Sequence, residues 1–287
     1  MKWLELSVQV PAEFVEPITL LFSRYGRAMS IEDVGYGQYV MRTYLTTRAK
    51  ERRARIEVGV KLIGGIRPIG DLNVQDIRST NWEETWKQHF SLLKVGKSLI
   101  VRPPWISDNT VSGKHVIEID PGLAFGTGHH PTTFMCLESL EELIVPGFRM
   151  LDLGTGSGIL SVAGAKLGAS EIIALDLDPN VMKVARQSLK ANNVKEIIRL
   201  GKGSLPHALV PERSFDLVVA NISAKVIQDC SIDIFNCLKQ GGLLVASGFL
   251  DVQRSEVLTH LGKAGFVLGN QRSVEDWVTL VLTKEER

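Results

Sequence analysis

The sequence has few cysteines, no long uncharged apolar run and no excess of one charge. Its three cysteines in 287 residues are too few and too scattered for a disulfide framework. No apolar run approaches the roughly 20 residues of a membrane helix, and the N-terminus MKWLELSVQV lacks the apolar core of a signal peptide. A net charge of +1 gives no global field for nucleic acid or membranes. These absences predict a cytoplasmic protein without a membrane segment.

The first part of the chain, residues 1–78, predicts a small α+β domain. Alternating strand patterns and two helical patterns follow one another in the order β-α-β-β-α-β, which is typical of a ferredoxin-like sandwich. The helices are predicted over AEFVEPITLLFSRYG and KERRARIEVGVKLIGG. A linker is predicted over residues 79–95, where STNWEETWKQHF reads as a helix. Trp82 and Trp86 share a face of that helix, and we expect them to pack between domains.

The remainder, residues 96–287, predicts a second and larger α/β domain. Nearly all-apolar strands alternate with helices, which indicates a mostly parallel sheet covered on both faces. One helix is predicted over AKVIQDCSIDIFNCLK, where Cys230 and Cys237 would share a face as small core residues. FVLGNQRSVED and WVTLVLTKE follow each other without a helix, so one of these strands is expected to run antiparallel at the sheet edge.

The glycine-rich segment LDLGTGSGILS links the first strand of this domain to its helix. Gly154, Gly156 and Gly158 let the backbone turn sharply and approach a ligand. The dinucleotide fingerprint G-x-G-x-x-G/A fails, because Ile159 stands at its last position when Gly154 is the first. A phosphate-binding P-loop is excluded as well, because the Gly-Lys-Ser/Thr ending is missing.

Two acidic residues accompany this loop and suggest its ligand. Asp152 precedes the turn and suits a ligand with an ammonium group and no pyrophosphate. Asp176 ends the next strand, 20 residues after Gly156, where a carboxylate can hold ribose hydroxyls. The combination predicts S-adenosylmethionine. The alternative is that the glycines serve only tight packing of helix on sheet.

A polar residue ends the fourth strand, FDLVVANIS. In this topology that end faces the bound ligand, and an Asn221 amide oxygen there can accept hydrogen bonds from an incoming amine. The alternative is that Asn221 only caps the next helix.

The segment AFGTGHHPTT is predicted to be a second cofactor-binding segment. Phe125 would shield the sulfonium from water, and Thr127 is placed in the same site. Pro131 stands at a favoured first helical position, and Thr133 in that first turn would face the cofactor.

The neighbouring histidines of that segment, His129 and His130, do not predict a metal. Adjacent residues before a helix do not point easily at one ion, and no further His, Cys or acid lies at ligand spacing. A loop-ordering role for His130 is favoured, and a proton shuttle stays open.

Several motifs together resemble one family, the bacterial methyltransferases that modify large-subunit ribosomal protein eleven. They are DPGLAFGTGHHPTT, LDLGTGSGILSVAGAKLGA, ALDLDP and VVANISA, together with the linker NWEETWKQHF. The first of these is highly specific, and the resemblance covers most of the chain. The sequence departs from the family at His129, where threonine is usual, and at Ser223, where leucine is common.

The resemblance implies an N-terminal ferredoxin-like substrate-recognition domain followed by a class I methyltransferase domain. It implies transfer of methyl groups from S-adenosylmethionine to lysine ε-amines and the N-terminal α-amine of the ribosomal protein. Carried over by motif, the cofactor contacts are Thr133, Gly154, Asp176 and Asn221. The expected partner is the ribosomal protein, without membrane or nucleic acid, and the enzyme is expected to be a monomer.

The main alternative is an RNA methyltransferase built on the same core. The run RAKERRAR at 48–55 is a candidate RNA surface, but the first 80 residues hold only 12 Lys/Arg against 9 Asp/Glu. The tyrosines nearby match no base-stacking motif. A binding module without activity is disfavoured because the loop, Asp176 and Asn221 are all intact.

Overall fold

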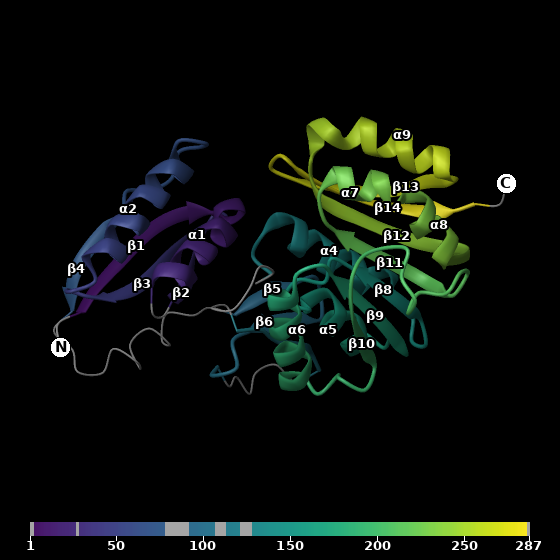
Figure 1. Cartoon of the computed structure of the whole chain (residues 1–287), viewed down its shortest axis with the longest axis horizontal. Helices are drawn as coiled ribbons and strands as arrows, with labels where there is room; N and C mark the ends of the chain where they lie inside the picture. Colours follow the sequence, from purple (N-terminus) through teal and green to yellow (C-terminus); the bar gives the residue numbers. More distant parts are fainter. Residues whose placement is uncertain (1–2, 27–28, 78–91, 107–112, 121–127, 286–287) are drawn as a thin grey trace.

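The computed structural model describes residues 3–26, 29–77, 92–106, 113–120 and 128–285. Two groups of elements are visible in Figure 1: an N-terminal unit, residues 3–77, and a C-terminal unit, residues 92–285. The predicted linker helix over STNWEETWKQHF, with Trp82 and Trp86, lies outside the described residues.

The N-terminal unit has four antiparallel strands in the order β2-β3-β1-β4. The elements are β1 (Trp3–Pro11), α1 (Ala12–Tyr25), β2 (Met29–Gly35), β3 (Gln38–Thr46), α2 (Lys50–Gly64) and β4 (Asn73–Ile77). Alternate residues of β1, among them Leu6 and Val8, are buried against Ile18 and Phe22, which lie four apart on α1. The predicted element order β-α-β-β-α-β is confirmed, and the sheet that it forms is antiparallel.

The C-terminal unit is built on a seven-stranded sheet in the order β10-β9-β8-β11-β12-β14-β13. The strands are β8 (Arg149–Leu153), β9 (Glu171–Asp176), β10 (Ile198–Lys202), β11 (Phe215–Asn221), β12 (Leu238–Leu250), β13 (Phe266–Val274) and β14 (Trp277–Lys284). The helices are α4 (Pro131–Leu143), α5 (Ile159–Lys166), α6 (Pro179–Ala191), α7 (Ala224–Asp229), α8 (Ser231–Cys237) and α9 (Arg254–Ala264). β10, β9, β8, β11 and β12 are parallel, as expected for a class I methyltransferase fold.

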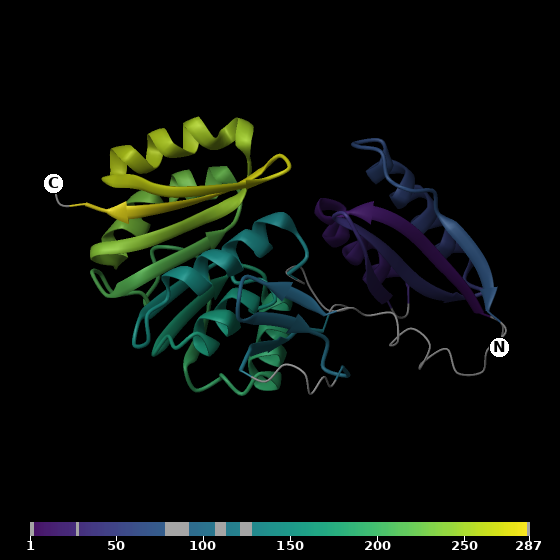
Figure 2. The same ribbon diagram turned by 180° about the vertical axis from the view of Figure 1, so that it is seen from behind.

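Both faces of this sheet are buried, which explains why its strands read as nearly continuous apolar runs. Met150 and Ile172 lie in the hydrophobic cluster that includes residues of α4, α5 and α6. Their chain neighbours Leu151 and Ile173 lie in a second cluster with residues of α7, α8 and α9. Neighbouring residues therefore point to opposite faces, and Figure 2 shows the sheet between the two helical layers.

Two expectations about this unit are corrected. The single helix predicted over AKVIQDCSIDIFNCLK is two helices, because Cys230 has φ −91° and ψ 2° and ends α7 before α8 begins. Cys230 and Cys237 thus do not share one helix, although both are buried. The antiparallel strand is β14, and it lies between β12 and β13 and not at the edge. The edge is occupied by β13.

A smaller sheet precedes the main one in the chain. It contains β5 (Leu93–Val95), β6 (Leu99–Arg102) and β7 (His115–Glu118). The strand patterns GKSLIVRPPW and KHVIEIDPG predict β6 and β7, whereas no pattern predicted β5. Val95 and Ile117 are fully buried and belong to the cluster of α4 and α5. The Glu141 carboxylate on α4 accepts hydrogen bonds from the backbone N–H groups of Lys97 and Ser98. The small sheet is therefore packed against α4, and the turn between β5 and β6 is hydrogen-bonded to it.

Candidate active site

The glycine loop after β8 has the tight geometry that the sequence predicted. Gly154 has φ +79°, and a Cβ there would lie 2.2 Å from Cγ2 of Ile222. The backbone N–H groups of Gly154 and Thr155 both donate to the Leu175 carbonyl at 2.9 Å. Only glycine therefore fits at position 154 without moving the Ile222 side chain. The loop is thereby fixed at the carboxyl ends of β8 and β9, where open α/β sheets bind ligands.

Asp152 lies beneath this loop and is fully buried. Its Oδ2 accepts hydrogen bonds from Thr155 Oγ1 at 2.7 Å and from Ser161 Oγ at 2.6 Å. Burial raises the pKa of this carboxyl to about 6. Within the part of the chain that the structure describes, Oδ1 has no hydrogen-bond partner. Asp152 therefore orders the loop from below, and both of its oxygens are buried beneath the loop.

Asp176 is brought to the same loop, as its position in the sequence suggested. Its Oδ2 accepts a hydrogen bond from the Gly156 backbone N–H at 3.0 Å, and Oδ1 accepts from the Asp178 N–H at 3.0 Å. The carboxylate is only partly buried. Asp176 therefore stands at the rim of the loop, with lone pairs still available to hydroxyl donors.

Asn221 and Thr133 meet although they lie 88 residues apart in the chain. Asn221 ends β11, and its Nδ2 donates to Thr133 Oγ1 on α4 at 3.2 Å. Because the Asn221 amide donates through nitrogen to α4, its Oδ1 is the acceptor that remains for a further ligand. The alternative capping role of Asn221 is not observed, because the N-cap of α7 is Ser223.

His130 is the N-cap of α4. Its Nδ1 accepts a hydrogen bond from the Thr132 backbone N–H at 3.3 Å and lies 2.8 Å from Thr132 Oγ1. Its ring packs edge to face on Trp277, with centroids 4.6 Å apart. Burial lowers the pKa of His130 to about 4, so the ring is neutral at pH 7. This is the loop-ordering role that the sequence favoured, and it holds the helix turn that carries Thr133.

A cavity of about 600 Å³ opens beside Asn221. The C-terminal unit lines it with His130, Thr132, Asn221, Ile222, Ser223, Gly248, Leu250, Asp276 and Trp277, and the N-terminal unit with Glu13, Phe14, Pro17, Ile66 and Arg67. Gly248, with φ +93°, allows β12 to pass the Ile222 backbone, which a Cβ would approach to 2.5 Å. The cavity is mostly apolar with Asn221 on its wall, which suits an aliphatic chain that ends in a polar group.

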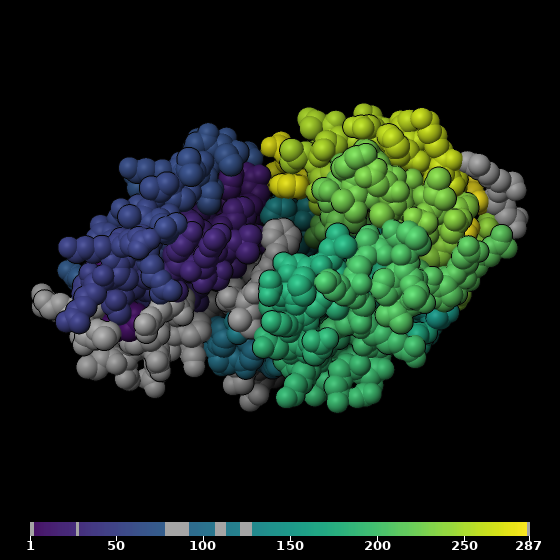
Figure 3. Space-filling model, viewed as in Figure 1, coloured from purple at the N-terminus to yellow at the C-terminus, as the bar shows by residue number. Residues whose placement is uncertain are grey.

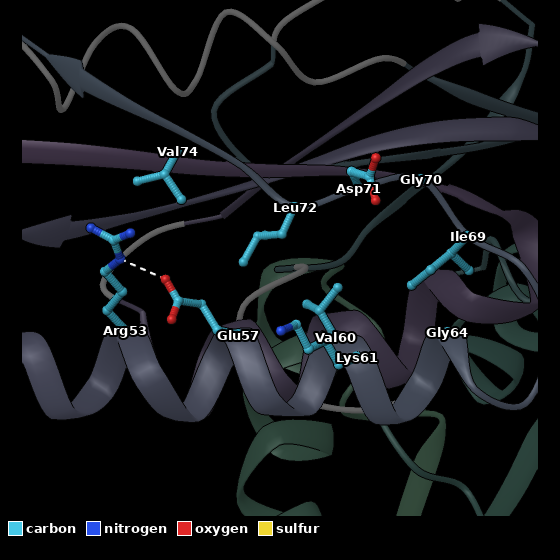
Figure 4. A pocket seen from close by; sticks show the side chains of 10 residues that line it. All are labelled: Arg53, Glu57, Val60, Lys61, Gly64, Ile69, Gly70, Asp71, Leu72 and Val74. Atoms are coloured by element: carbon cyan, nitrogen blue, oxygen red, sulfur yellow. Dashed lines mark hydrogen bonds and ion pairs between the residues drawn. The ribbon is translucent and has the colours of Figure 1, made fainter.

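A second cavity, of about 590 Å³, lies within the N-terminal unit between α2 and the segment that enters β4 (Figure 4). Its polar lining includes the ion pair of Arg53 and Glu57 at 2.7 Å. None of the predicted site residues lines it. The cavity beside Asn221 is therefore the candidate active site.

The structure thus brings Thr133, Asp152, Gly154, Gly156, Asp176 and Asn221 to one edge of the sheet, while Phe125 and Thr127 lie outside the described residues. Trp277, Gly248 and the N-terminal residues of the cavity were missed. No short motif marks them, because they come from segments far apart in the sequence. The tryptophan that directly follows the β13–β14 turn was the one available signal.

A family model described as ribosomal protein L11 methyltransferase (PrmA) matches residues 2–285. The chain belongs to this family. Membership confirms the expected activity, methylation of ribosomal protein L11, and the expected methyl donor, S-adenosylmethionine.

Individual relatives match most of the chain. A ribosomal protein L11 methyltransferase of Chloroflexus aurantiacus is 36% identical over 318 residues, covering 97% of both chains. That of an Exiguobacterium species is 40% identical over 215 residues, covering 75% of this chain and 68% of the relative. The crystal structure of a ribosomal protein L11 methylase from Lactobacillus delbrueckii subsp. bulgaricus is 29% identical with a TM-score of 0.64. That likeness covers 69% of this chain and all of the solved one.

Neither a metal site nor a membrane-spanning helix is present among the residues that the structure describes. No group of three His, Cys, Asp or Glu side chains among them is arranged to hold a metal ion. No described helix is both long and apolar enough to cross a membrane.

Proposed function

We propose that the chain methylates primary amines of ribosomal protein L11, namely lysine ε-amines and the N-terminal α-amine, and that the amine enters the cavity beside Asn221. The observation that supports this most strongly is the hydrogen bond of Asn221 to Thr133, which leaves an amide oxygen on the cavity wall. An amine N–H can donate to that oxygen. The apolar wall suits the methylene chain of lysine.

The glycine loop fits the methyl donor. The buried Asp152 orders the loop through Thr155 and Ser161, Gly154 has no side chain where a Cβ would clash, and Asp176 stands at the rim. We assign Asp152 and Gly154 to the methionine end, Asp176 to the ribose hydroxyls, and Thr133 and Gly156 to contacts nearby. S-adenosylmethionine, when bound, supplies an electrophilic methyl group on a sulfonium.

The residues of this chain hold and desolvate the amine. A lysine amine with an ordinary pKa of about 10.4 needs roughly 4–5 kcal/mol to lose its proton at pH 7. The apolar cavity disfavours the ammonium form and so lowers that requirement. His130 is neutral there and adds no positive charge of its own. Asn221 Oδ1 would orient the amine lone pair, and the proton would pass to water.

The proposed domain boundaries, cellular location and oligomeric state rest on the sequence. Residues 1–78 would recognise the ribosomal protein, residues 79–95 would link, and residues 96–287 would carry the reaction. The separate sheet and hydrophobic cluster of the N-terminal unit support that division. The enzyme would act as a cytoplasmic monomer without a nucleic-acid substrate.

The test is methyl transfer from S-adenosylmethionine to purified, unmethylated L11, with the modified residues mapped by mass spectrometry. We expect methylated lysines and a methylated N-terminus. The Asn221→Ala variant should lower kcat by about 100-fold or more, in the range for loss of a positioned polar group, with a much smaller loss of cofactor affinity. Asn270→Ala, on the exposed face of β13, is the matched control. Methylation of ribosomal RNA in place of the protein would contradict the proposal, as would full turnover by Asn221→Ala.

A further inference from the structure

The candidate active site includes residues from both units, and an ion pair joins them at its mouth. Arg67, which follows α2, donates to Glu13 Oε1 on α1 at 2.8 Å. The same guanidinium nitrogen lies 3.6 Å from Asp276 Oδ2, in the turn between β13 and β14. All three residues line the cavity beside Asn221. In Figures 1 and 3 this turn, in yellow, reaches toward α1, in purple.

Negative charge is in excess around Arg67. Three carboxylates face it: Glu13 from α1, and Glu275 and Asp276 from the β13–β14 turn. The field of Glu13, the nearest of them, raises the pKa of Arg67. Burial and the same Glu13 raise the pKa of Glu275, while Arg67 lowers it. One guanidinium therefore holds together carboxylates that would otherwise repel one another across the two units.

The contact is not isolated. Tyr39 of the N-terminal unit meets His129, just before α4, edge to face with ring centroids 5.1 Å apart. The ring pair and the Arg67 ion pair lie on segments that flank the cavity, one near α4 and the other at the β13–β14 turn. Both contacts join the N-terminal unit to the unit that carries Asn221.

We propose that Arg67 is a positioning residue for the acceptor: by bridging Glu13 and Asp276, it holds the N-terminal unit against the cavity, and the amine-binding site is complete only while the bridge is formed. The inference rests on the proposed function, since it concerns the same cavity. It assigns to Arg67 a role in acceptor binding and none in cofactor binding, because the glycine loop lies on the C-terminal unit alone.

The direction in which the KM for L11 changes distinguishes a positioning role of Arg67 from a purely electrostatic one. If Arg67 acted only as a positive charge near the site, its removal would leave the mouth more negative, and a cationic acceptor would bind more tightly. If Arg67 positions the N-terminal unit, its removal loosens the site and the acceptor binds less tightly. The KM for L11 therefore falls in the first case and rises in the second.

The experiment measures kcat, KM for L11 and cofactor affinity for the full chain and its variants. Arg67→Ala should raise KM about twofold to fivefold, the range for a partly exposed ion pair, with kcat and cofactor affinity nearly unchanged. Arg67→Glu should raise KM further, because four carboxylates then face each other. Adding Asp276→Arg to Arg67→Glu should recover part of the loss. Arg55→Ala is the matched control, since Arg55 is similarly exposed and its described contacts lie within the N-terminal unit, with Glu51 at 2.9 Å and with the ring of Tyr25 on α1.

A measurement without substrate keeps the inference separate from the proposed function. Small-angle X-ray scattering should give a larger radius of gyration for Arg67→Glu than for the parent chain or for Arg55→Ala, and adding Asp276→Arg should reduce it. If the parent chain failed to methylate L11, the proposed function would fail and scattering alone would decide the inference. An unchanged or lower KM for Arg67→Ala, or equal radii for all variants, would overturn it.

Discussion

Lowering the pH from 8 to 5 should cost the protein stability through one buried ring, His130. The side chain is only 5% exposed, and burial holds its pKa at about 4 against an ordinary value of 6.5. Below pH 6.5 the unfolded chain therefore takes up a proton that the folded chain refuses until about pH 4. The unfolded state gains from that proton, so the stability linked to His130 is present at high pH and is lost as the pH falls through this window.

The magnitude follows from the two pKa values, which differ by about 2.5 pH units. The net loss of stability, with proton uptake by both states counted, is about 2 kcal/mol at pH 5 and reaches roughly 3.4 kcal/mol at pH values well below 4. Asp152 acts in the opposite direction. Its folded pKa of about 6 lies above its ordinary 3.8, so the folded state gains stability as the pH falls through 6. The pH profile of the parent protein alone would mix the two effects.

The assay is therefore a comparison with the His130→Asn variant, by urea unfolding at several pH values from 8 to 5. Asparagine is a good N-cap and can still accept from the Thr132 N–H, but it does not titrate. The variant loses the contact with Trp277 at every pH, which is a constant offset. The difference in unfolding free energy, parent minus variant, should fall by about 2 kcal/mol from pH 8 to pH 5. Parallel profiles for the two proteins would refute the reasoning.

Three further outcomes are expected. Gly154→Ala should destabilise the protein by about 1–3 kcal/mol, since φ is +79° and the new Cβ would meet Ile222 at 2.2 Å. Urea unfolding measures this loss, and an unchanged unfolding midpoint would contradict it. Asp176→Asn should weaken binding of S-adenosylmethionine by about tenfold, through the lost charge-assisted hydrogen bonds, as measured by calorimetry, with Asp229→Asn as the exposed control. Treatment with a chelator should leave methyl transfer at its starting rate, and a loss that added metal restores would contradict this.

Local patterns in the sequence were enough for much of the fold. The strands of the main sheet are apolar on both faces, and helical periodicity separates them, so their order along the chain could be predicted. The glycine loop, Asp176 and Asn221 lie directly at strand ends, where the topology fixes their position. The break at Cys230 could not be predicted, because helical periodicity continues across it while the backbone does not.

The features that the sequence did not predict depend on contacts between distant segments. Two adjacent strands at the end of a sheet indicate a hairpin, but they do not say which of the two pairs with β12. Trp277, Arg67 and Glu13 reach the cavity only after three separate segments have folded together. Arg67 and Glu13 are ordinary residue types for a loop and a helix, so nothing in the local pattern sets them apart. Only the tryptophan at the start of β14 gave a local signal.

The insertion of β14 between β12 and β13 has a consequence for synthesis of the protein. β14 pairs with β12 from Leu243 to Leu250 and supplies Trp277 to the cavity. It also follows every other strand of the sheet in the chain. During translation, β12 therefore keeps an unpaired edge, and edges of this kind invite pairing with other chains. The cavity and the α4 cap that rests on Trp277 reach their final form only after β14 has left the exit tunnel, so the nascent chain should acquire its activity in one late step.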